Sequence, residues 1–193
     1  CGIKANKRFF YVYSGDDARQ VDLDTLYETD NLIFNLLTEE DISIIRTVKR
    51  KGAYSLQNSA WALGVVTGDN KKKLHPTCLE GMEKIYTGKE IQPYRLKEVQ
   101  NYIFYDRANL QQVAREEIYR APEKLVYKFI SNRLTFAYDD SSSLFLNSAN
   151  ILIPAIPFMG VKTVMAFLNS SLFQFMYSKL FGEVKTLKGN LIE

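Results

Sequence analysis

Runs of apolar residues alternate with polar stretches along the chain, and their spacing predicts a mixture of strands and helices. Short apolar runs rich in aromatic and branched residues are typical of strands. The expected strands are 9–14, 60–66, 101–105, 125–130, 134–138 and 144–153, with a short return at 184–187. The runs 125–130 and 134–138 flank the turn 131–133, so we expect them to form a β-hairpin.

Three other segments carry the periodicity of amphipathic helices. The first begins at Thr38, which forms a capping-box-like pair with Asp41; acidic residues fill its first turn, basic residues fill its last, and Gly52 can end it. The second is 110–120, which a proline follows, and the third is 161–181, whose apolar residues recur at helical spacing. The pattern therefore predicts an α+β fold with a mixed, largely antiparallel sheet and two or three packed helices.

The segment 61–74 carries the strongest sequence signal for a ligand. An apolar strand breaks at a turn-forming cluster and leads directly into three consecutive lysines. Glycine permits a positive φ, asparagine offers a donor and an acceptor, and the lysines supply cationic charge. This composition is typical of a loop that contacts a phosphate-bearing partner, although an ordinary surface turn has it too. The residues concerned are Thr67, Gly68, Asp69, Asn70, Lys71, Lys72 and Lys73.

Charge is distributed unevenly along the chain, whose formal net charge is +3. Between Asp16 and Asp41 there are nine carboxylates and one basic residue, whereas from Ile42 onward 21 Lys and Arg accompany 13 Asp and Glu. A field of that sign favours association with a polyanion. With 193 residues, of which 46% are hydrophobic and 24% charged, the chain has the composition of a globular protein with one good core.

Five short segments, in a fixed order along the chain, resemble those of a known family. They are the glycine turn 64–70, 86–94 (Tyr-Thr-Gly-Lys-Glu-Ile-Gln-Pro-Tyr), 119–125 (Tyr-Arg-Ala-Pro-Glu-Lys-Leu), 147–150 (Asn-Ser-Ala-Asn) and 166–170 (Ala-Phe-Leu-Asn-Ser). On these segments the chain resembles the C-terminal specificity, or target recognition, domain of TaqI-like adenine DNA methyltransferases and related fused type II restriction-modification enzymes.

The resemblance implies a DNA target recognition domain over 53–193, with 1–52 as a connector or the trailing part of an upstream catalytic domain, including one helix. The implied partners are double-stranded DNA and the upstream methyltransferase domain of the same polypeptide, in the cytoplasm. S-adenosylmethionine is expected for the parent protein, and no cofactor for this part. Besides residues 67–73, the expected DNA contacts are Lys89, Arg95, Lys128, Arg133, Asn147, Lys185 and Lys188.

Signals for catalysis are sparse, and we expect no catalytic residue in this chain. No Gly-x-Gly occurs, so a glycine-rich loop for a nucleotide or S-adenosylmethionine has no candidate, and the Asn-Pro-Pro-Tyr motif of amino-methylating enzymes is missing. One histidine and two cysteines at these spacings make no zinc-ligand set, so we expect no metal site. No apolar run approaches the roughly 18 residues of a membrane span. Because the chain begins at Cys1 instead of methionine, we expect it to be a piece of a longer protein.

Two other classes of function stay open. Glu183 and Lys185 have the spacing of a magnesium-dependent nuclease half-site, for which Asp139 or Asp140 could supply a further carboxylate. A protein-interaction module is the other class, because aromatic residues make up 13% of the chain and four of them could form an exposed strand edge. Those four are Phe9, Phe10, Tyr11 and Tyr13.

Overall fold

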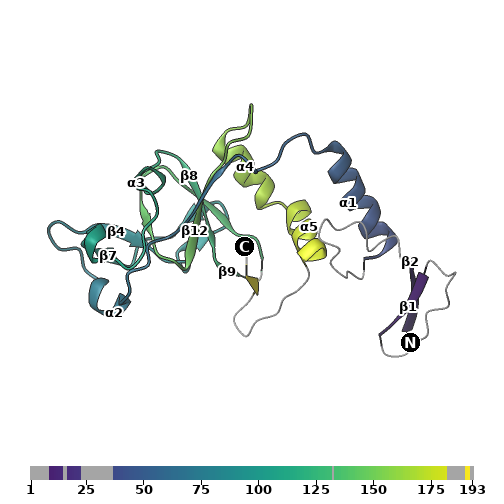
Figure 1. Ribbon diagram of the computed structural model, residues 1–193, viewed down its shortest axis with the longest axis horizontal. Helices are drawn as coiled ribbons and strands as arrows, with labels where there is room; N and C mark the ends of the chain where they lie inside the picture. The colour runs from purple at the N-terminus through teal and green to yellow at the C-terminus, as the bar shows by residue number, and fades with distance from the viewer. Residues whose placement is uncertain (1–8, 15–16, 23–36, 132, 182–189, 192–193) are drawn as a thin grey trace. The chain divides into compact units, whose positions relative to one another are not determined.

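The structure is a computed structural model of the chain and describes residues 9–14, 17–22, 37–131, 133–181 and 190–191 (Figure 1). It divides into two compact units, Cys1–Ala53 with Phe175–Glu183, and Tyr54–Gln174 with Val184–Glu193. The first unit contains β1 (Phe9–Ser14), β2 (Asp17–Asp22), α1 (Glu39–Lys51) and most of α5 (Ser171–Phe181). The elements of the second unit are β3 (Ala60–Leu63), α2 (Asn70–Lys73), β4 (Glu83–Tyr86), β5 (Ile91–Gln92), β6 (Arg95–Leu96), β7 (Tyr102–Ile103), the 3-10 helix η2 (Arg107–Asn109), α3 (Glu116–Tyr119), β8 (Lys124–Lys128), β9 (Ile130–Ser131), β10 (Phe136–Asp139), β11 (Leu144–Phe145), β12 (Ala149–Ile153), α4 (Val161–Leu168) and β13 (Asn190–Leu191).

Helix α1 begins and ends where the sequence predicts. The Thr38 hydroxyl accepts a hydrogen bond from the backbone N–H of Asp41 (3.1 Å), and the Asp41 carboxylate accepts one from the backbone N–H of Thr38 (2.9 Å). At the other end, the N–H of Gly52 donates to the carbonyl of Val48 (2.8 Å). The capping box satisfies backbone donors that the first helical turn leaves unpaired. Strand β1 is also confirmed, and it pairs with β2, which the sequence did not predict.

The first unit is held together by contacts between α1 and α5. The Lys179 ammonium donates to the Asp41 carboxylate (2.9 Å). Burial favours the neutral form of Asp41, but the hydrogen bonds from Thr38 and Lys179 outweigh burial and lower the pKa of this carboxyl. The apolar part of the contact consists of Leu37, Ile42 and Ile45, with Phe175, Met176 and Leu180 packed against them.

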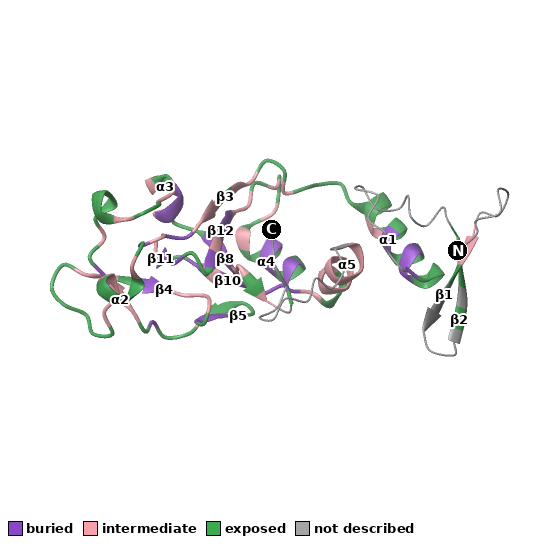
Figure 2. Ribbon diagram, turned by 60° about the horizontal axis from the view of Figure 1, so that its bottom comes forward, coloured by how far each residue is buried: buried purple, intermediate pink, exposed green. Residues whose placement is uncertain are grey.

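Four antiparallel strands form the central sheet of the second unit, in the order β10-β8-β12-β3. Val126 of β8 pairs with Ala137 of β10 on one side and with Ile151 of β12 on the other. All three side chains are fully buried, and the buried residues of the unit gather along these central strands (Figure 2). The prediction of a mixed α+β fold with a largely antiparallel sheet is confirmed.

A smaller sheet and two strand pairs complete the second unit. The smaller sheet has the order β11-β4-β7, in which β11 and β4 are parallel and β4 and β7 are antiparallel. The pairs are β5 with β6 and β9 with β13. The common core includes Val65, Ile85, Ile91, Ile103, Ile118, Val126, Leu144, Phe145 and Ile151.

Gly64 allows β3 to lie directly against the β11–β12 turn. A Cβ atom at Gly64 would lie 2.3 Å from the carbonyl oxygen of Leu146 and 2.6 Å from that of Phe145. Two backbone hydrogen bonds close the same junction, from Gly64 N–H to Ala149 O (3.0 Å) and from Val65 N–H to Phe145 O (2.7 Å). Only glycine permits this approach, so the first glycine of the 64–70 segment has a packing role.

The segment 119–125 fastens α3 to two different strands. The Tyr119 hydroxyl accepts from the N–H of Ala114 (2.9 Å) and donates to the carbonyl of Leu63 (3.1 Å). The guanidinium of Arg120 makes a bidentate contact with the Glu83 carboxylate on β4 (2.6 and 2.9 Å). Tyr119 and Arg120, the first two residues of the segment 119–125, thus stabilise the fold.

A buried ion pair lies at the centre of the second unit. The Lys124 ammonium is 2.8 Å from Asp139 Oδ2, and the two side chains are 0% and 1% exposed. Lys124 also donates to the Tyr119 carbonyl (2.7 Å), and Asp139 accepts from the N–H of Ser143 (3.0 Å). Burial lowers the pKa of the Lys124 ammonium, although its hydrogen bond to Asp139 opposes that shift. The pair thus joins β8, β10, α3 and the loop before β11.

The predicted helix over 110–120 is wrong, because residues 110–115 are not helical and only α3 is. The N–H groups of Gln111 and Gln112 donate to the carbonyl of Val66 (2.9 and 3.1 Å), and the N–H of Val66 donates to Gln112 O (2.9 Å). A backbone paired in this way cannot close helical hydrogen bonds. The apolar residues of the segment still pack on the core, namely Leu110, Val113, Ala114 and Ile118.

The predicted helix over 161–181 is interrupted and forms α4 and α5. The Asn169 side chain accepts from the N–H of Phe136 (2.9 Å) and donates to its carbonyl (2.8 Å), which ties the end of α4 to β10. Ser170 then caps α5, since its hydroxyl accepts from the N–H of Phe173 (3.2 Å). The Asn-Ser pair at the end of the 166–170 segment therefore separates two helices.

The predicted pairing of the runs 125–130 and 134–138 is confirmed as the antiparallel pair β8–β10, but the turn is longer than predicted. Strand β8 ends at Lys128, and Ile130–Ser131 forms β9, which pairs with β13. The predicted strand over 144–153 divides into β11 and β12. The N–H groups of Leu146 and Asn147 donate to Tyr86 O (2.8 Å) and Val65 O (3.0 Å), which turns the chain between the two strands. The strand expected at 184–187 lies outside the described residues.

We expect Lys124→Met to lower the free energy of unfolding by about 3–5 kcal/mol, because it leaves the Asp139 carboxylate buried without its counter-ion. Urea denaturation followed by the fluorescence of Trp61, the single tryptophan, measures the change. Lys84→Met, at an exposed lysine on β4, is the matched control and should change the stability by less than about 0.5 kcal/mol. Equal stability of Lys124→Met and wild type would show that the pair contributes nothing.

Candidate functional site

The lysine-rich segment after β3 forms a compact turn followed by one turn of helix. Gly68 has a φ of 84°, as its place in the sequence predicts. The Asp69 carboxylate caps α2 by accepting from the N–H groups of Lys71 (3.1 Å) and Lys72 (3.2 Å). The three lysines therefore extend from a helical turn and not from an open loop.

Lys73 differs from its two neighbours in what it contacts. Its ammonium donates to the carbonyl of Thr67 (2.6 Å) and to the carbonyl of Asn109, in η2. Lys71 and Lys72 are exposed, and Lys72 lies 3.6 Å from the Asp69 carboxylate in a surface ion pair. A surface pair of this kind restrains the lysine weakly. Lys71 and Lys72 can thus reach a ligand, whereas Lys73 joins two segments of the fold.

Asn70 is the residue of this segment that faces a pocket. Its side-chain oxygen accepts from the hydroxyl of Thr67 (2.5 Å), and Thr67 itself is only 2% exposed. This contact orients the amide and leaves its two N–H donors for a ligand. Thr67 and Asp69 thus act within the turn, and Asn70 is presented by it.

Four of the predicted site residues, from four separate segments, line one pocket of about 810 Å³. They are Asn70 of α2, Lys89 after β4, Lys128 at the end of β8, and Asn147 between β11 and β12. The β-sheet brings the last two together, since Lys128 pairs with Ala149. Gly88 N–H donates to the Ser148 hydroxyl (2.9 Å), which fixes the chain beside Lys89 to the same turn.

Glu90 holds the turn that presents Lys89. The Glu90 side chain is 5% exposed, and its carboxylate accepts from both the N–H and the hydroxyl of Thr87 (2.6 Å each). Its backbone carbonyl accepts from the N–H of Lys97 (2.8 Å). Because the Glu90 carboxylate is turned inward, Lys89 and Lys97 dominate the outer surface of this segment.

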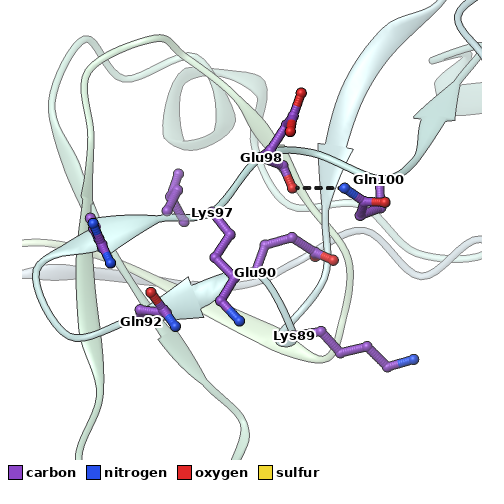
Figure 3. Close-up of a pocket in the computed structure, with 8 residues that line it drawn as sticks. Lys89, Glu90, Gln92, Lys97, Glu98 and Gln100 are labelled. Carbon is purple, nitrogen blue, oxygen red and sulfur yellow. Dashed lines mark hydrogen bonds between the residues drawn. The ribbon is translucent and has the colours of Figure 1, made fainter.

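A second pocket adjoins the first along the β5–β6 hairpin and contains Arg95 and Lys97. Figure 3 shows Lys89, Glu90, Gln92 and Lys97 around it, with the Gln100 amide donating to the Glu98 carbonyl (3.4 Å). A third pocket is lined by Gln92, Pro93, Lys128, Ser131, Arg133 and Thr135.

The three pockets share walls and form one continuous surface. Lys89 and Gln100 line the first and second, Gln92 the second and third, and Lys128 the first and third. We call this surface the basic face. It presents five cations, one exposed carboxylate (Glu98) and three asparagines. The cations are Lys89, Arg95, Lys97, Lys128 and Arg133, and the asparagines are Asn70, Asn101 and Asn147.

Lys97, Gln92 and Gln100 belong to the basic face but not to the predicted site. The sequence could have predicted Lys97 as a site residue. It lies two residues after Arg95, and a strand places residues at this spacing on the same side. Lys185 and Lys188, by contrast, lie outside the described residues, and their DNA contacts stay a prediction.

The nuclease hypothesis names Asp139 or Asp140 as a further metal ligand. Asp139 is buried against Lys124, whereas Asp140 is exposed. Within the described ranges no group of three His, Cys, Asp or Glu side chains is arranged to hold a metal ion. Glu183 and Lys185 lie outside those ranges. The observed geometry thus offers this hypothesis no support.

The aromatic strand of the interaction hypothesis is partly covered. In β1, Phe9 and Tyr11 pack edge to face with ring centroids 5.8 Å apart. Phe9 and Phe10 are half-buried and Tyr11 is exposed, while the side chain of Tyr13 is outside the described set.

None of the helices in the described part of the chain has the length and apolar character needed to span a bilayer.

Comparison with known proteins identifies a family over more than half of the chain. The family model described as the TaqI-like C-terminal specificity domain matches residues 83–192. No curated protein matches the chain. The matched span contains every residue that lines the basic face except Asn70 and Leu74.

We expect Lys73→Ala to lower the free energy of unfolding by about 1–3 kcal/mol, because it leaves the carbonyls of Thr67 and Asn109 without a charged donor. Lys72→Ala, in the same helical turn, is the control and should change stability by less than about 0.5 kcal/mol. Urea denaturation of the two variants measures the difference. Equal stabilities would show that Lys73 is as free as its neighbours.

Proposed function

The chain belongs to the family of TaqI-like C-terminal specificity domains, which recognise DNA, and we propose that its basic face is the surface that binds the duplex. One observation carries the proposal. Asn70, Lys89, Lys128 and Asn147 are far apart in the sequence, yet they line one pocket that continues into two further cationic pockets.

The charge of the basic face suits a polyanion. Cations that neutralise phosphates release the counter-ions condensed on DNA, which supplies affinity without regard to sequence. Lys71 and Lys72 are exposed next to Asn70 and extend the positive charge beyond the pockets. We assign phosphate contacts to these two lysines and to Lys89 and Lys128.

Different side chains on the same face have the geometry to read bases. The guanidinium of Arg95 or Arg133 can donate two hydrogen bonds to guanine in the major groove, and the amide of Asn70 or Asn147 can pair with adenine. All four residues are exposed. Residues within 67–73 and 89–147 would therefore contact the DNA phosphates, which positions the domain, and would also read the base edges directly.

We further propose that the chain serves an adenine DNA methyltransferase, with or without endonuclease activity, in the cytoplasm. The description of the family as a C-terminal specificity domain supports this arrangement. In it, an upstream domain would bind S-adenosylmethionine, residues 1–52 would connect to that domain, and Lys185 and Lys188 would add phosphate contacts. Sequencing the upstream part of the parent gene tests it, since a glycine-rich loop and an Asn-Pro-Pro-Tyr motif are expected there.

Lys71→Ala and Lys72→Ala should each weaken binding to all duplexes alike and reduce the slope of log affinity against log salt by about 0.9, the value for one phosphate contact. Fluorescence anisotropy of the full chain with a duplex of random sequence, over a series of salt concentrations, measures the slope. Lys84→Ala, at an exposed lysine that lines none of the three pockets, is the control and should keep it. Unchanged slopes in both variants would remove these lysines from the interface.

Arg133→Lys should reduce discrimination between cognate and random DNA by about 1–3 kcal/mol while keeping the salt slope, because lysine keeps the charge and loses the planar fork. Asn70→Ala should have the same effect on discrimination. A preferred site selected from a randomised duplex library with the wild-type chain supplies the cognate probe. Variants that bind both probes more weakly by one common factor would identify these residues as backbone contacts.

A further inference from the structure

The tip of the β5–β6 hairpin places a tyrosine in a conformation that normally requires glycine. The turn is formed by Pro93 and Tyr94, and Tyr94 has a φ of 75°. Positive φ values are uncommon for residues other than glycine, asparagine and aspartate, and a bulky side chain makes them costly. The fold therefore keeps Tyr94 at this position in spite of an unfavourable backbone.

The backbone of Tyr94 is fixed to the central sheet. Its N–H donates to the carbonyl of Phe136 in β10 (2.8 Å), and Tyr94 forms a parallel bridge with Ala137. Strands β5 and β6 both pack beside β10. The hairpin tip is thus anchored to a buried strand, and the direction of the Tyr94 side chain is set by it.

The fold makes little use of the Tyr94 side chain itself. The residue is 51% exposed. Within the described part of the chain, its hydroxyl has no hydrogen-bond partner and its ring pairs with no other aromatic ring. A glycine would relieve the backbone and lose few contacts. An exposed aromatic side chain that the fold does not use is available to a ligand.

The surroundings of Tyr94 identify the ligand class. Its neighbour Pro93 lines the pocket of Lys128 and Arg133, and its other neighbour, Arg95, lines the pocket of Lys89 and Lys97. Tyr94 is therefore flanked in the sequence by one residue from each of two cationic pockets of the basic face, and it lines neither pocket itself. Cations on both sides would hold phosphates, and the uncharged ring between them has the planar surface that stacks on a base.

We propose that Tyr94 is a fixed aromatic contact of the basic face that stacks on a DNA base where the duplex stacking is interrupted. The inference rests on the proposed function and extends it with a contact that carries no charge. The rigid turn lowers the entropy lost on binding, because only the two side-chain torsions of the tyrosine remain to be ordered.

The test compares two probes, a short duplex of random sequence and the same duplex with a single-nucleotide gap, which exposes an unpaired base. Measuring wild type and Tyr94→Gly against both probes separates stacking from the greater flexibility and lower charge of the gapped duplex. We expect the full wild-type chain to bind the gapped duplex more tightly, because the gap offers a base that is already unstacked. Tyr94→Gly should lower the affinity for the gapped duplex roughly 5- to 150-fold, the range for one base stacked on an aromatic side chain. Its salt slope should stay unchanged, since no phosphate contact is lost.

Two variants separate stacking from other roles. Tyr94→Phe keeps the ring and should keep the preference for the gapped duplex, so a loss equal to that of Tyr94→Gly would overturn stacking in favour of a hydroxyl contact. Tyr94→Gly should be at least as stable as wild type in urea, because glycine suits the positive φ; a large loss of stability would make the residue structural and overturn the inference. Full binding of both probes by Tyr94→Gly would overturn the inference and leave the proposed function standing. Failure of the wild-type chain to bind either probe would overturn both.

Discussion

The buried pair of Lys124 and Asp139 is the interaction on which the second unit depends. Two charges at 0% and 1% exposure are tolerable only when each is matched, and here every contact of the pair belongs to a different element. Lys124 donates to the end of α3, and Asp139 accepts from the loop before β11. The pair consequently fixes β8 and β10 against α3 and against the loop before β11, the strand that leads into the pocket-lining residues 146–148.

Strand β8 shows how one frame supports both packing and binding. It has a lysine at each end, and the two lysines differ in exposure because their surroundings differ. Lys124 is enclosed by Asp139 and the Tyr119 carbonyl, whereas Lys128 reaches the pocket opposite Ala149. With the first lysine fixed, the register of the strand places the second at the surface. The position of a pocket-lining residue is therefore set by a buried one.

Local interactions were the part of the fold that the sequence predicted well. The Thr38–Asp41 capping box, the β8–β10 hairpin and the positive φ of Gly68 depend on residues close in sequence. The helix over 110–120 failed because its backbone pairs with Val66, more than forty positions earlier in the chain. The break at Asn169 was missed for the same reason, since its amide binds Phe136. Contacts between distant segments override a local periodicity, and one sequence does not reveal them.

The same limit applies to the candidate site. Sequence alone treated Lys71, Lys72 and Lys73 alike, yet only the third meets the carbonyls of Thr67 and Asn109. The residues that remain free to bind extend from turns and strand ends, where they have few packing partners. Substitutions there would alter the proposed DNA-binding surface and leave the buried pair untouched. A fixed interior and replaceable surface side chains are thus physically separate in this fold, so the surface can change without loss of the core.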